Sequence, residues 1–247
     1  QRFTSSKRQG YGMKNWNLGR LCIAVMMSLA MLSSIAAQET PVSTADGGKA
    51  KVHAQFEALF TSITDQLTNN QQMYLNNPTS YYDFLTSTVI DLWDSSSTTR
   101  ALVGKTHYKK LGEQQLGSLV AAVDQTLIRY AFEGLDSYGG QVFRVADVVV
   151  NEKQGMGWVQ VLMESPIIPD INLDILIKRN DTDAWHAVDI RVKGITYVAI
   201  KKHKYREILE EQGVKALMDN LTIKNTEFFT TVCAGANNPE LVGIAPC

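Results

Sequence analysis

The sequence predicts an α+β fold in which helices cover a curved, four-stranded antiparallel sheet. Residues 141–194 hold four short runs rich in Val, Ile and Leu, and turn residues separate these runs. Connections this short join antiparallel neighbours, because a parallel crossover needs a dozen or more residues. Amphipathic segments precede the runs, and a sheet with one apolar face needs a cover. We therefore expect the helices to pack on that face.

The four runs alternate in the manner of half-buried strands. They are Val142–Asn151, Trp158–Glu164, Asn172–Arg179 and Trp185–Val192. Residues two positions apart share one side of a pleated strand. On this rule the inward side carries Val159, Val161, Met163, Leu173, Ile175, Ile177, Val188, Ile190 and Val192. Asp189 and Arg191 then lie on the opposite side.

Residues 13–37 have the pattern of a cleaved secretory signal. A basic start leads into the apolar run LCIAVMMSLAMLSSIA, and small residues close it, which predicts cleavage after Ala36 or Ala37. We expect Met13 to be the true start, so that residues 1–12 are not part of the mature protein. A retained membrane anchor is the rival interpretation, and the shortness of the apolar run weighs against it.

Removal of residues 1–37 would leave an acidic protein. The chain has 24 Lys and Arg against 25 Asp and Glu, and five of the basic residues but none of the acidic ones lie in residues 1–37. The mature chain then has 19 basic and 25 acidic residues, a net charge of −6. This balance argues against a broad nucleic-acid surface, which needs a basic field.

Two of the three cysteines, Cys233 and Cys247, remain after export. We expect a disulfide between them, because disulfides persist in oxidising compartments. Closing a loop of about 15 residues stabilises a protein by about 3 kcal/mol in the chain-entropy model. Two free thiols on a frayed tail are the alternative. The sequence has no CxxC pair and no Cys/His spacing typical of a metal site.

Apolar stripes predict the helices that precede the sheet. We expect residues 38–50 to form a disordered polar leader and a helix to begin near Lys51, where Val, Phe, Leu and Ile recur at steps of three and four. A second helix is expected to begin after Thr79 or Ser80, either of which is a good N-cap. Residues 95–97, three serines in a row, should break it.

Further helices are expected before and after the sheet in the sequence. A short one is expected to end at Gly104 and a long one to open near Gly112. After the sheet, a helix begins near Lys202, and Gly213 interrupts it before a last amphipathic segment. Residues 222–247 show no clear period, and we expect a tail of irregular structure there.

The run after the last strand resembles a family signature. Residues 192–221, VKGITYVAIKKHKYREILEEQGVKALMDNL, are similar to the C-terminal region of the MlaC family, also called the toluene-tolerance family. The positions in register are Trp185, Asp189, Gly194, Ile195, Thr196, Tyr197, Val198, Tyr205, Gly213, Leu217 and Leu221. Upstream, residues 102–105 and 113–114 resemble the segment that leads into the family's long helix. The resemblance covers about residues 51–221.

Several positions depart from the family pattern. His107 stands near a family Trp, Lys202 stands where the family has Arg, Val188 replaces an aromatic residue, and Lys193 replaces Glu. The tail with two cysteines is extra. These differences indicate a diverged member of the family.

The resemblance implies a fold similar to the nuclear-transport-factor-like cone, with a deep apolar pocket between the sheet and the helices. The family consists of periplasmic phospholipid-binding proteins of an ABC lipid-transport system. It implies that residues 51–221 form a phospholipid-binding domain and that the protein is not an enzyme. It also implies a monomer that needs no cofactor besides its phospholipid cargo.

The resemblance further implies partners in both membranes of the envelope. The carrier would shuttle phospholipid between an outer-membrane lipoprotein complex and an inner-membrane ABC transporter with its substrate-binding ring. Such transport maintains outer-membrane lipid asymmetry, and the expected location is the periplasm.

An apolar pocket suffices to retain an acyl chain, because burying each methylene contributes about 0.8 kcal/mol. We expect inward strand residues to line it, with helix residues opposite them. The candidates are Phe56, Phe60, Leu119, Val123, Phe143, Val145, Val159, Val161, Met163, Ile175, Ile177, Val188, Ile190 and Tyr197. Plain core packing is the alternative for each of them.

Two other functions stay open at this point. A small cone-fold enzyme could use Asp147 or Asp189 as a general base, although solvated or fold-supporting aspartates are the simpler interpretation. An exported interaction module with a filled core is the other. The basic run at residues 201–204 could meet a lipid headgroup or an acidic partner, and a solvated helix start is its simpler interpretation.

Overall fold

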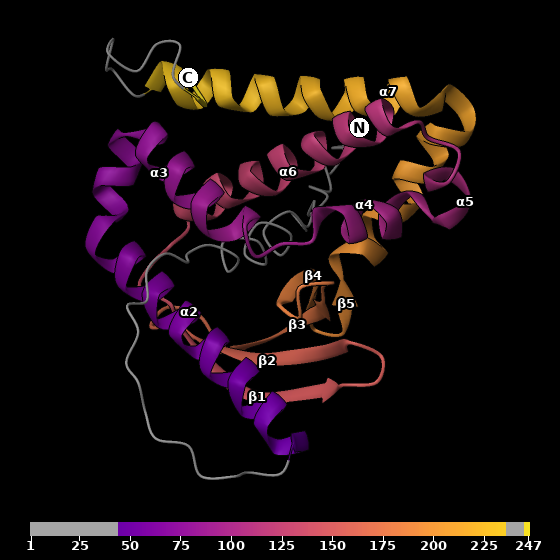
Figure 1. Cartoon of the computed structure of the whole chain (residues 1–247). Coiled ribbons are helices and arrows are strands. Elements are labelled where there is room, and N and C mark those ends of the chain that lie inside the picture. Colours follow the sequence, from indigo (N-terminus) through magenta and orange to yellow (C-terminus); the bar gives the residue numbers. More distant parts are fainter. Residues whose placement is uncertain (1–43, 236–244) are drawn as a thin grey trace, which may run out of the picture.

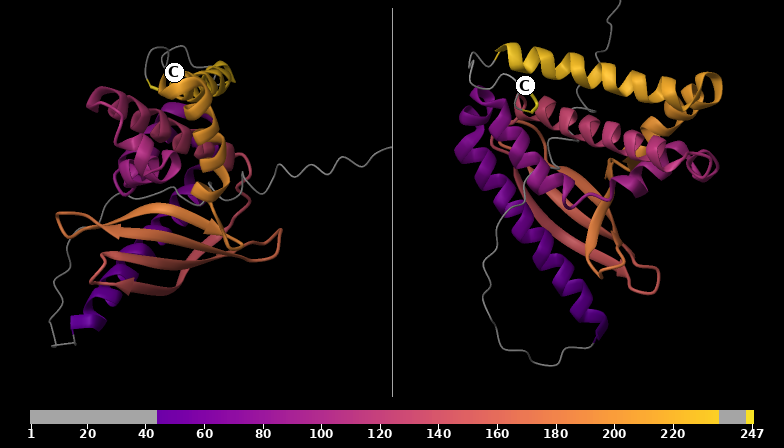
Figure 2. Two further views of the ribbon diagram at one scale, coloured as in Figure 1. Left: turned by 90° about the vertical axis from the view of Figure 1, so that its right-hand side faces the viewer. Right: turned by 45° about the horizontal axis from the view of Figure 1, so that its top comes forward.

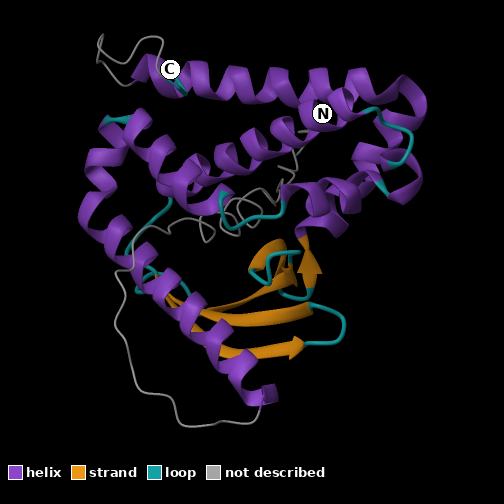
Figure 3. Cartoon of the chain, in the orientation of Figure 1, coloured by secondary structure: helices purple, strands orange, loops and turns teal. Residues whose placement is uncertain are grey.

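The computed structural model describes residues 44–235 and 245–247, so the expected signal segment, residues 13–37, and the residues before it lie outside the described part. Helices precede and follow a single sheet (Figures 1 and 3). The elements in chain order are α2 (Thr44–Asn76), α3 (Pro78–Leu85), the π-helix η2 (Thr86–Ile90), α4 (Ser95–Val103), α5 (Lys105–Tyr108), α6 (Glu113–Leu135), β1 (Val142–Asn151), β2 (Met156–Glu164), β3 (Ile171–Arg179), β4 (Trp185–Val192), β5 (Ile195–Thr196) and α7 (Tyr197–Gly235).

The sheet has the strand order β1-β2-β3-β4-β5, with each strand antiparallel to its neighbours. Helix α2 runs along the sheet, α7 starts directly beside β5, and α6 and the later part of α7 lie in the part of the helical layer farthest from the sheet (Figures 1 and 2). The predicted α+β fold with an antiparallel meander is confirmed. The short strand β5 is an addition to the four that were expected.

One apolar core fills the space between the sheet and the helices. Strands β2 and β3 alternate as predicted, because every second side chain is buried in this core. The buried residues of these two strands include Val159, Val161, Met163, Leu173, Ile175 and Ile177. The helices contribute Phe, Leu, Ile and Tyr side chains from the stripes that predicted them.

Two β-bulges interrupt the pairing of the sheet. The register of β1 against β2 shifts between Val145 and Asp147, and that of β3 against β4 shifts between Leu176 and Ile177. An extra residue in one strand of a pair bends that strand and increases its twist. The bulges therefore give the sheet the curvature that Figure 2 shows.

The second bulge corrects the alternation predicted for β4. Ile177 pairs with Ala187 and Ile175 pairs with Ile190, so Val188 occupies the extra position. Val188 is buried but lies outside the core cluster that contains Ala187 and Ile190. The regular alternation expected for β4 is thus interrupted at this point, because a bulge changes the phase of the strand, and Ala187 joins the core cluster although the alternation did not predict it.

Side chains of α2 cover part of the edge of β1. The backbone N–H of Val145 donates to Oε2 of Glu57 at 2.8 Å, and that of Phe143 donates to Oγ1 of Thr64 at 3.4 Å. Unpaired N–H groups at the edge of a sheet can form hydrogen bonds with a strand of another chain. Here the helix supplies acceptors for two of them.

The first two helices begin earlier than the sequence indicated. Helix α2 starts at Thr44, within the segment expected to be a disordered leader, instead of near Lys51. Helix α3 is capped by Asn77, whose side-chain oxygen accepts from the N–H of Ser80 at 3.1 Å, instead of by Thr79 or Ser80. Pro78 follows the cap, which suits a first helical position because proline lacks an N–H and has a fixed φ.

The serines at residues 95–97 begin a helix and do not break one. Asp94 caps α4 by accepting from the N–H of Ser97 at 2.8 Å. Serines in the first turn lie close to this cap, where a small polar residue is well tolerated. The helix ends at Val103, and Gly104 follows it with a φ of 83°, as the sequence predicted.

Helix α7 is longer at both ends than expected. It begins at Tyr197 instead of near Lys202 and continues to Gly235, so residues 222–235 are helical and not irregular. Gly213, with a φ of 84°, makes the predicted interruption. The later part packs on α6, where the buried Asn225 side chain donates to the carbonyl of Ala122 at 3.1 Å.

A disulfide joins Cys233 to Cys247 and brings the end of the chain back to the last turns of α7. In the described part of the chain, no helix combines the length and the apolar character that crossing a membrane requires.

Candidate functional site

A small apolar cavity lies between α2, the segment from η2 to Trp93, and the sheet. Its lining consists of apolar and aromatic residues, with Thr88 as the exception. The lining residues are Phe56, Leu59, Phe60, Ile63, Thr88, Val89, Leu92, Trp93, Ile175 and Ala187. Ligand sites are usually apolar cavities with few polar groups, so this interface is the candidate site.

The cavity has a volume of about 30 Å³. An apolar cavity that holds a single benzene molecule is about 150 Å³ in volume, so this cavity is several times smaller. A hydrocarbon tail does not fit into this space unless the walls separate. The deep pocket expected from the sequence therefore stays a prediction.

Three of the fourteen candidate lining residues, Phe56, Phe60 and Ile175, reach the cavity. Ten others are buried in the surrounding core without lining it. They are Leu119, Val123, Phe143, Val145, Val159, Val161, Met163, Ile177, Ile190 and Tyr197. Val188 is buried in the bulge of β4.

Sequence reasoning missed the wall formed by η2 and the residues after it. Val89 and Trp93 lie on the apolar stripe of the second predicted helix, so that stripe was the available signal. Ala187 was missed because the bulge that turns it inward leaves no mark in the alternation.

The wall of the cavity contains a π-helical turn. Short π-helical segments within helices occur often at functional sites. The hydroxyl of Thr86 donates to the carbonyl of Tyr82 at 3.1 Å, and that of Ser87 donates to the carbonyl of Asp83 at 2.8 Å. Side-chain donors of this kind compete with the regular backbone pattern and loosen it.

The end of this wall is hydrogen-bonded to β4. The N–H of Ala187 donates to the carbonyl of Leu92, and the N–H of Asp94 donates to the carbonyl of Ala187, both at 2.8 Å. This places Trp93 beside Ala187 as a parallel bridge. The indole of Trp93 is therefore held against the sheet where it borders the cavity.

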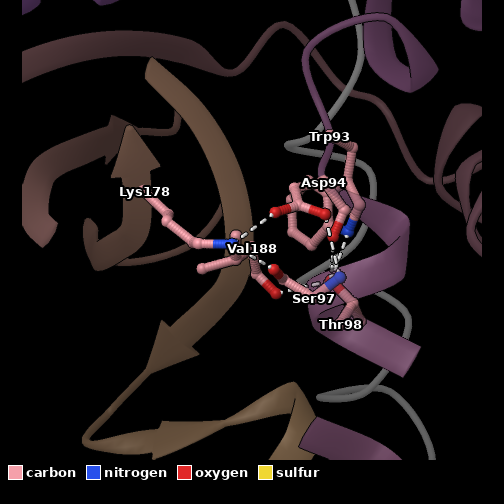
Figure 4. Close-up of polar contacts among 6 residues, drawn as sticks. All are labelled: Trp93, Asp94, Ser97, Thr98, Lys178 and Val188. Atoms are coloured by element: carbon pink, nitrogen blue, oxygen red, sulfur yellow. Dashed lines mark hydrogen bonds and ion pairs between the residues drawn. The ribbon is translucent and has the colours of Figure 1, made fainter. Parts of the chain in front are cut away.

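Thr98 adds a buried polar link at the same place (Figure 4). Its Oγ1 accepts from the indole Nε1 of Trp93 at 2.8 Å and lies 2.6 Å from the carbonyl oxygen of Val188, to which it donates. Both side chains are buried, so each of these polar groups depends on its partner.

An ion pair completes the attachment of α4 to the sheet (Figure 4). Nζ of Lys178 lies 3.2 Å from Oδ2 of Asp94 and donates to Oγ of Ser97 at 2.8 Å. Burial tends to raise the pKa of Asp94, but hydrogen bonds from Ser97 and Lys178 outweigh it, so the pKa is lowered. The charged form is thus favoured.

The two aspartates considered as bases have separate structural roles. Asp147 is exposed and lies 2.8 Å from Nζ of Lys49, whose hydrogen bond lowers the pKa of Asp147. Asp189 is buried, and its Oδ1 accepts from the N–H groups of Ile190 at 2.9 Å and Val198 at 3.2 Å. Burial raises the pKa of Asp189, and these hydrogen bonds oppose the rise. Asp189 therefore secures the start of α7.

Within residues 44–235 and 245–247, no group of three or more His, Cys, Asp or Glu side chains is placed to hold a metal ion. The site that the structure presents is an apolar interface between α2, the η2 wall and the sheet.

Comparison with known proteins relates this architecture to a family. A solved structure of a phospholipid-binding protein from Ralstonia solanacearum, in complex with a phospholipid, is 16% identical in sequence with a TM-score of 0.57. The alignment covers 73% of this chain and 98% of that one. No curated protein matches this chain. The model of the MlaC protein family matches residues 57–222, which is more than half of the chain. The chain therefore belongs to the MlaC family.

Proposed function

We propose that the protein is a periplasmic carrier that holds phospholipid by its acyl chains between α2, η2 and the sheet. The observation that carries this proposal is the apolar lining of the cavity, with Thr88 as its one polar residue. Membership of the MlaC family supports it. The related fold of a protein described as phospholipid-binding, whose structure contains a phospholipid, supports it further.

Binding requires the cavity to widen, since its present volume is about 30 Å³. Each methylene transferred from water into the protein contributes about 0.8 kcal/mol, so two acyl chains can offset the loss of helix–sheet contacts. The η2 turn is the part of the wall suited to move, because its backbone pattern already departs from the regular helix.

The partners of the carrier are part of the same proposal. Export by the segment at residues 13–37 would place the protein in the periplasm. There it would exchange phospholipid with an outer-membrane lipoprotein complex and with an inner-membrane ABC transporter bearing a substrate-binding ring. Family membership supports this route.

Lipid extraction tests the proposal directly. The full chain would be expressed in a bacterial envelope, purified, and compared by mass spectrometry under native and denaturing conditions. We expect phospholipid to co-purify in a fixed ratio. Protein that carries no phospholipid, and takes none up from detergent-free vesicles, would contradict the proposal.

A cavity-filling variant links the cargo to this cavity. Ala187 borders it and is buried, so Ala187→Phe places a ring where the acyl chain would enter. We expect Ala187→Phe to retain less than half as much phospholipid as the wild type. Val149→Phe is the matched control, because Val149 is 52% exposed on β1 and away from the cavity lining. Equal lipid content in the two variants would place the cargo elsewhere.

An enzymatic role has no comparable support. The MlaC family is non-enzymatic. Asp147 forms an exposed ion pair and Asp189 secures α7, so neither is presented to the cavity as a base.

A further inference from the structure

The corner where β5 meets α7 combines lysines with exposed isoleucines. Ile195 is 57% exposed and Ile200 is 58% exposed, although large apolar side chains are usually covered. Lysines surround them in the sequence. We call this group the junction patch, and its residues are Lys193, Ile195, Ile200, Lys201, Lys202 and Lys204.

The backbone brings these residues to one corner of the molecule. Lys193 and Gly194 form the tight turn between β4 and β5, with φ values of 50° and 83°. Strand β5 has only two residues and leads directly into Tyr197, the first residue of α7 (Figure 1). Asp189 fixes this arrangement by accepting from the N–H of Val198.

The positive charge of the patch is largely uncompensated. Among the described residues, Lys193, Lys201 and Lys202 have no ion-pair partner, and Nζ of Lys201 lies 5.1 Å from the ring centre of Tyr130. Lys204 is paired with Glu207 at 3.1 Å, on the surface, where such pairs are weak.

Arg206 and Lys105 extend the positive charge toward α4 and α5. Arg206 lies one turn after Lys202 and donates to the carbonyl of Ala101 at 3.2 Å. Its guanidinium is also beside Gly104, the residue before the exposed Lys105. The basic surface thus joins two segments that are about a hundred residues apart in the sequence, in a protein whose expected mature charge is negative.

We propose that the junction patch docks the protein on an anionic lipid surface. Exposed apolar side chains that can enter the headgroup region, together with lysines close by that attract anionic lipid, are the features of interfacial membrane binding. A protein partner is less well matched. Binding hot spots between proteins are enriched in Trp, Tyr and Arg, whereas the exposed residues of this patch are Lys and Ile. Docking goes beyond cargo binding, because it concerns how the carrier reaches a bilayer.

Co-sedimentation with vesicles tests the proposal. The full chain would be mixed with phosphatidylcholine vesicles, with and without phosphatidylglycerol, at low and high salt. We expect binding only to the anionic vesicles, and weaker binding at high salt because salt screens the lysines. The variant with Lys193→Gln, Lys201→Gln and Lys202→Gln should partition on the order of a hundredfold less, since each lysine near the surface contributes about fivefold.

The matched control changes the same charge elsewhere. Lys51, Lys153 and Lys224 are exposed and lie outside the patch, so replacing all three with Gln tests net charge alone. We expect this control to keep most of its binding. A second variant, Ile195→Ser with Ile200→Ser, should weaken binding at both salt concentrations, because insertion is not screened.

The proposal would be overturned if the wild-type protein did not bind anionic vesicles, or if the patch variant and the control lost binding to the same extent. Binding to an acidic protein without binding to vesicles would overturn it as well. Phospholipid extraction from the same variants separates this test from that of the carrier function. We expect the patch variants to hold cargo as the wild type does.

Discussion

Thr98 joins three parts of the structure through one hydroxyl. It is fully buried, accepts from the indole of Trp93 and donates to the carbonyl of Val188. Its neighbour Thr99 is equally buried, but its hydroxyl has no hydrogen-bond partner in the described part of the chain. Two adjacent threonines therefore have different energetic roles.

We predict that Thr98→Val lowers the free energy of unfolding by about 2 kcal/mol, because Trp93 and Val188 each lose a partner while buried. Thr99→Val is the control and should be neutral or slightly stabilising, since it replaces an unpartnered hydroxyl with a methyl group. Urea denaturation of both variants measures the difference. Similar losses in the two variants would show that the hydrogen bonds of Thr98 contribute little.

Asp189 makes the stability depend on pH. Burial raises the pKa of its carboxyl, so the folded protein holds the proton more tightly than the unfolded chain. The stabilisation is complete below the unfolded pKa and is lost as pH rises through the folded value. Asp189→Asn keeps a side-chain oxygen acceptor without the charge. We predict that the variant gains stability relative to the wild type between about pH 4 and pH 7.

Urea denaturation at several pH values checks the prediction for Asp189. Asp147→Asn is the control, because the pKa of Asp147 is lowered and the opposite trend is expected. If the wild type instead becomes more stable relative to Asp189→Asn as the pH rises, the direction assigned to the pKa of Asp189 is wrong.

Among the elements, α7 depends on a single glycine. Gly213 has a φ of 84°, and regular helical geometry continues on either side of it. This conformation is strained for residues with a Cβ. The bend lets the second part of α7 fold back over α6, as Figure 2 shows.

We predict that Gly213→Ala destabilises the protein by about 1–2 kcal/mol, because alanine must adopt a positive φ. Gly117 lies inside α6 with open space around the position of a Cβ, so Gly117→Ala is the control and should stabilise by up to about 1 kcal/mol. Thermal unfolding followed by circular dichroism compares them. A stabilising effect of Gly213→Ala would mean that the bend is not required.

The strands were predictable from the sequence because their alternation is local. The bounds of β1 and β4 agree with the runs of apolar residues, and β2 and β3 begin only slightly earlier than expected. What local pattern does not encode is the phase change at Val188, because a bulge depends on how the two strands pair. That is why Ala187 was missed as a cavity residue.

The helix ends were harder to predict because caps and tertiary contacts decide them. Asp94 caps α4, so the three serines that follow it form the first turn of the helix, although a run of serines by itself indicates a break. Residues 222–235 mix polar and apolar residues without a clear period, but Asn225 and Phe229 are buried against α6, and this packing extends the helix. The site was predictable as an apolar interface. Which residues border the cavity depends on the packing of η2.

At the scale of the whole molecule, stability and cargo are coupled if the carrier proposal holds. A ligand that binds only the folded protein stabilises it by about 2.7 kcal/mol at a hundred times its Kd. We predict that removing bound phospholipid lowers the Tm by several degrees and that adding it back restores the value. Scanning calorimetry of loaded and delipidated protein measures this. An unchanged Tm would mean that lipid occupies no part of the folded interior.

The contacts of Glu57 and Thr64 with β1 decide which wall can yield. These side chains accept hydrogen bonds from backbone N–H groups at the edge of the sheet. Moving α2 away from β1 would therefore leave two backbone donors of β1 without acceptors. We therefore expect α2 and β1 to stay together when the cavity widens. The part expected to move is the η2 turn, whose C-terminal end is held to β4 by the hydrogen bonds around Trp93. On the carrier proposal a lipid would enter beneath this turn, while the edge of β1 stays covered by α2.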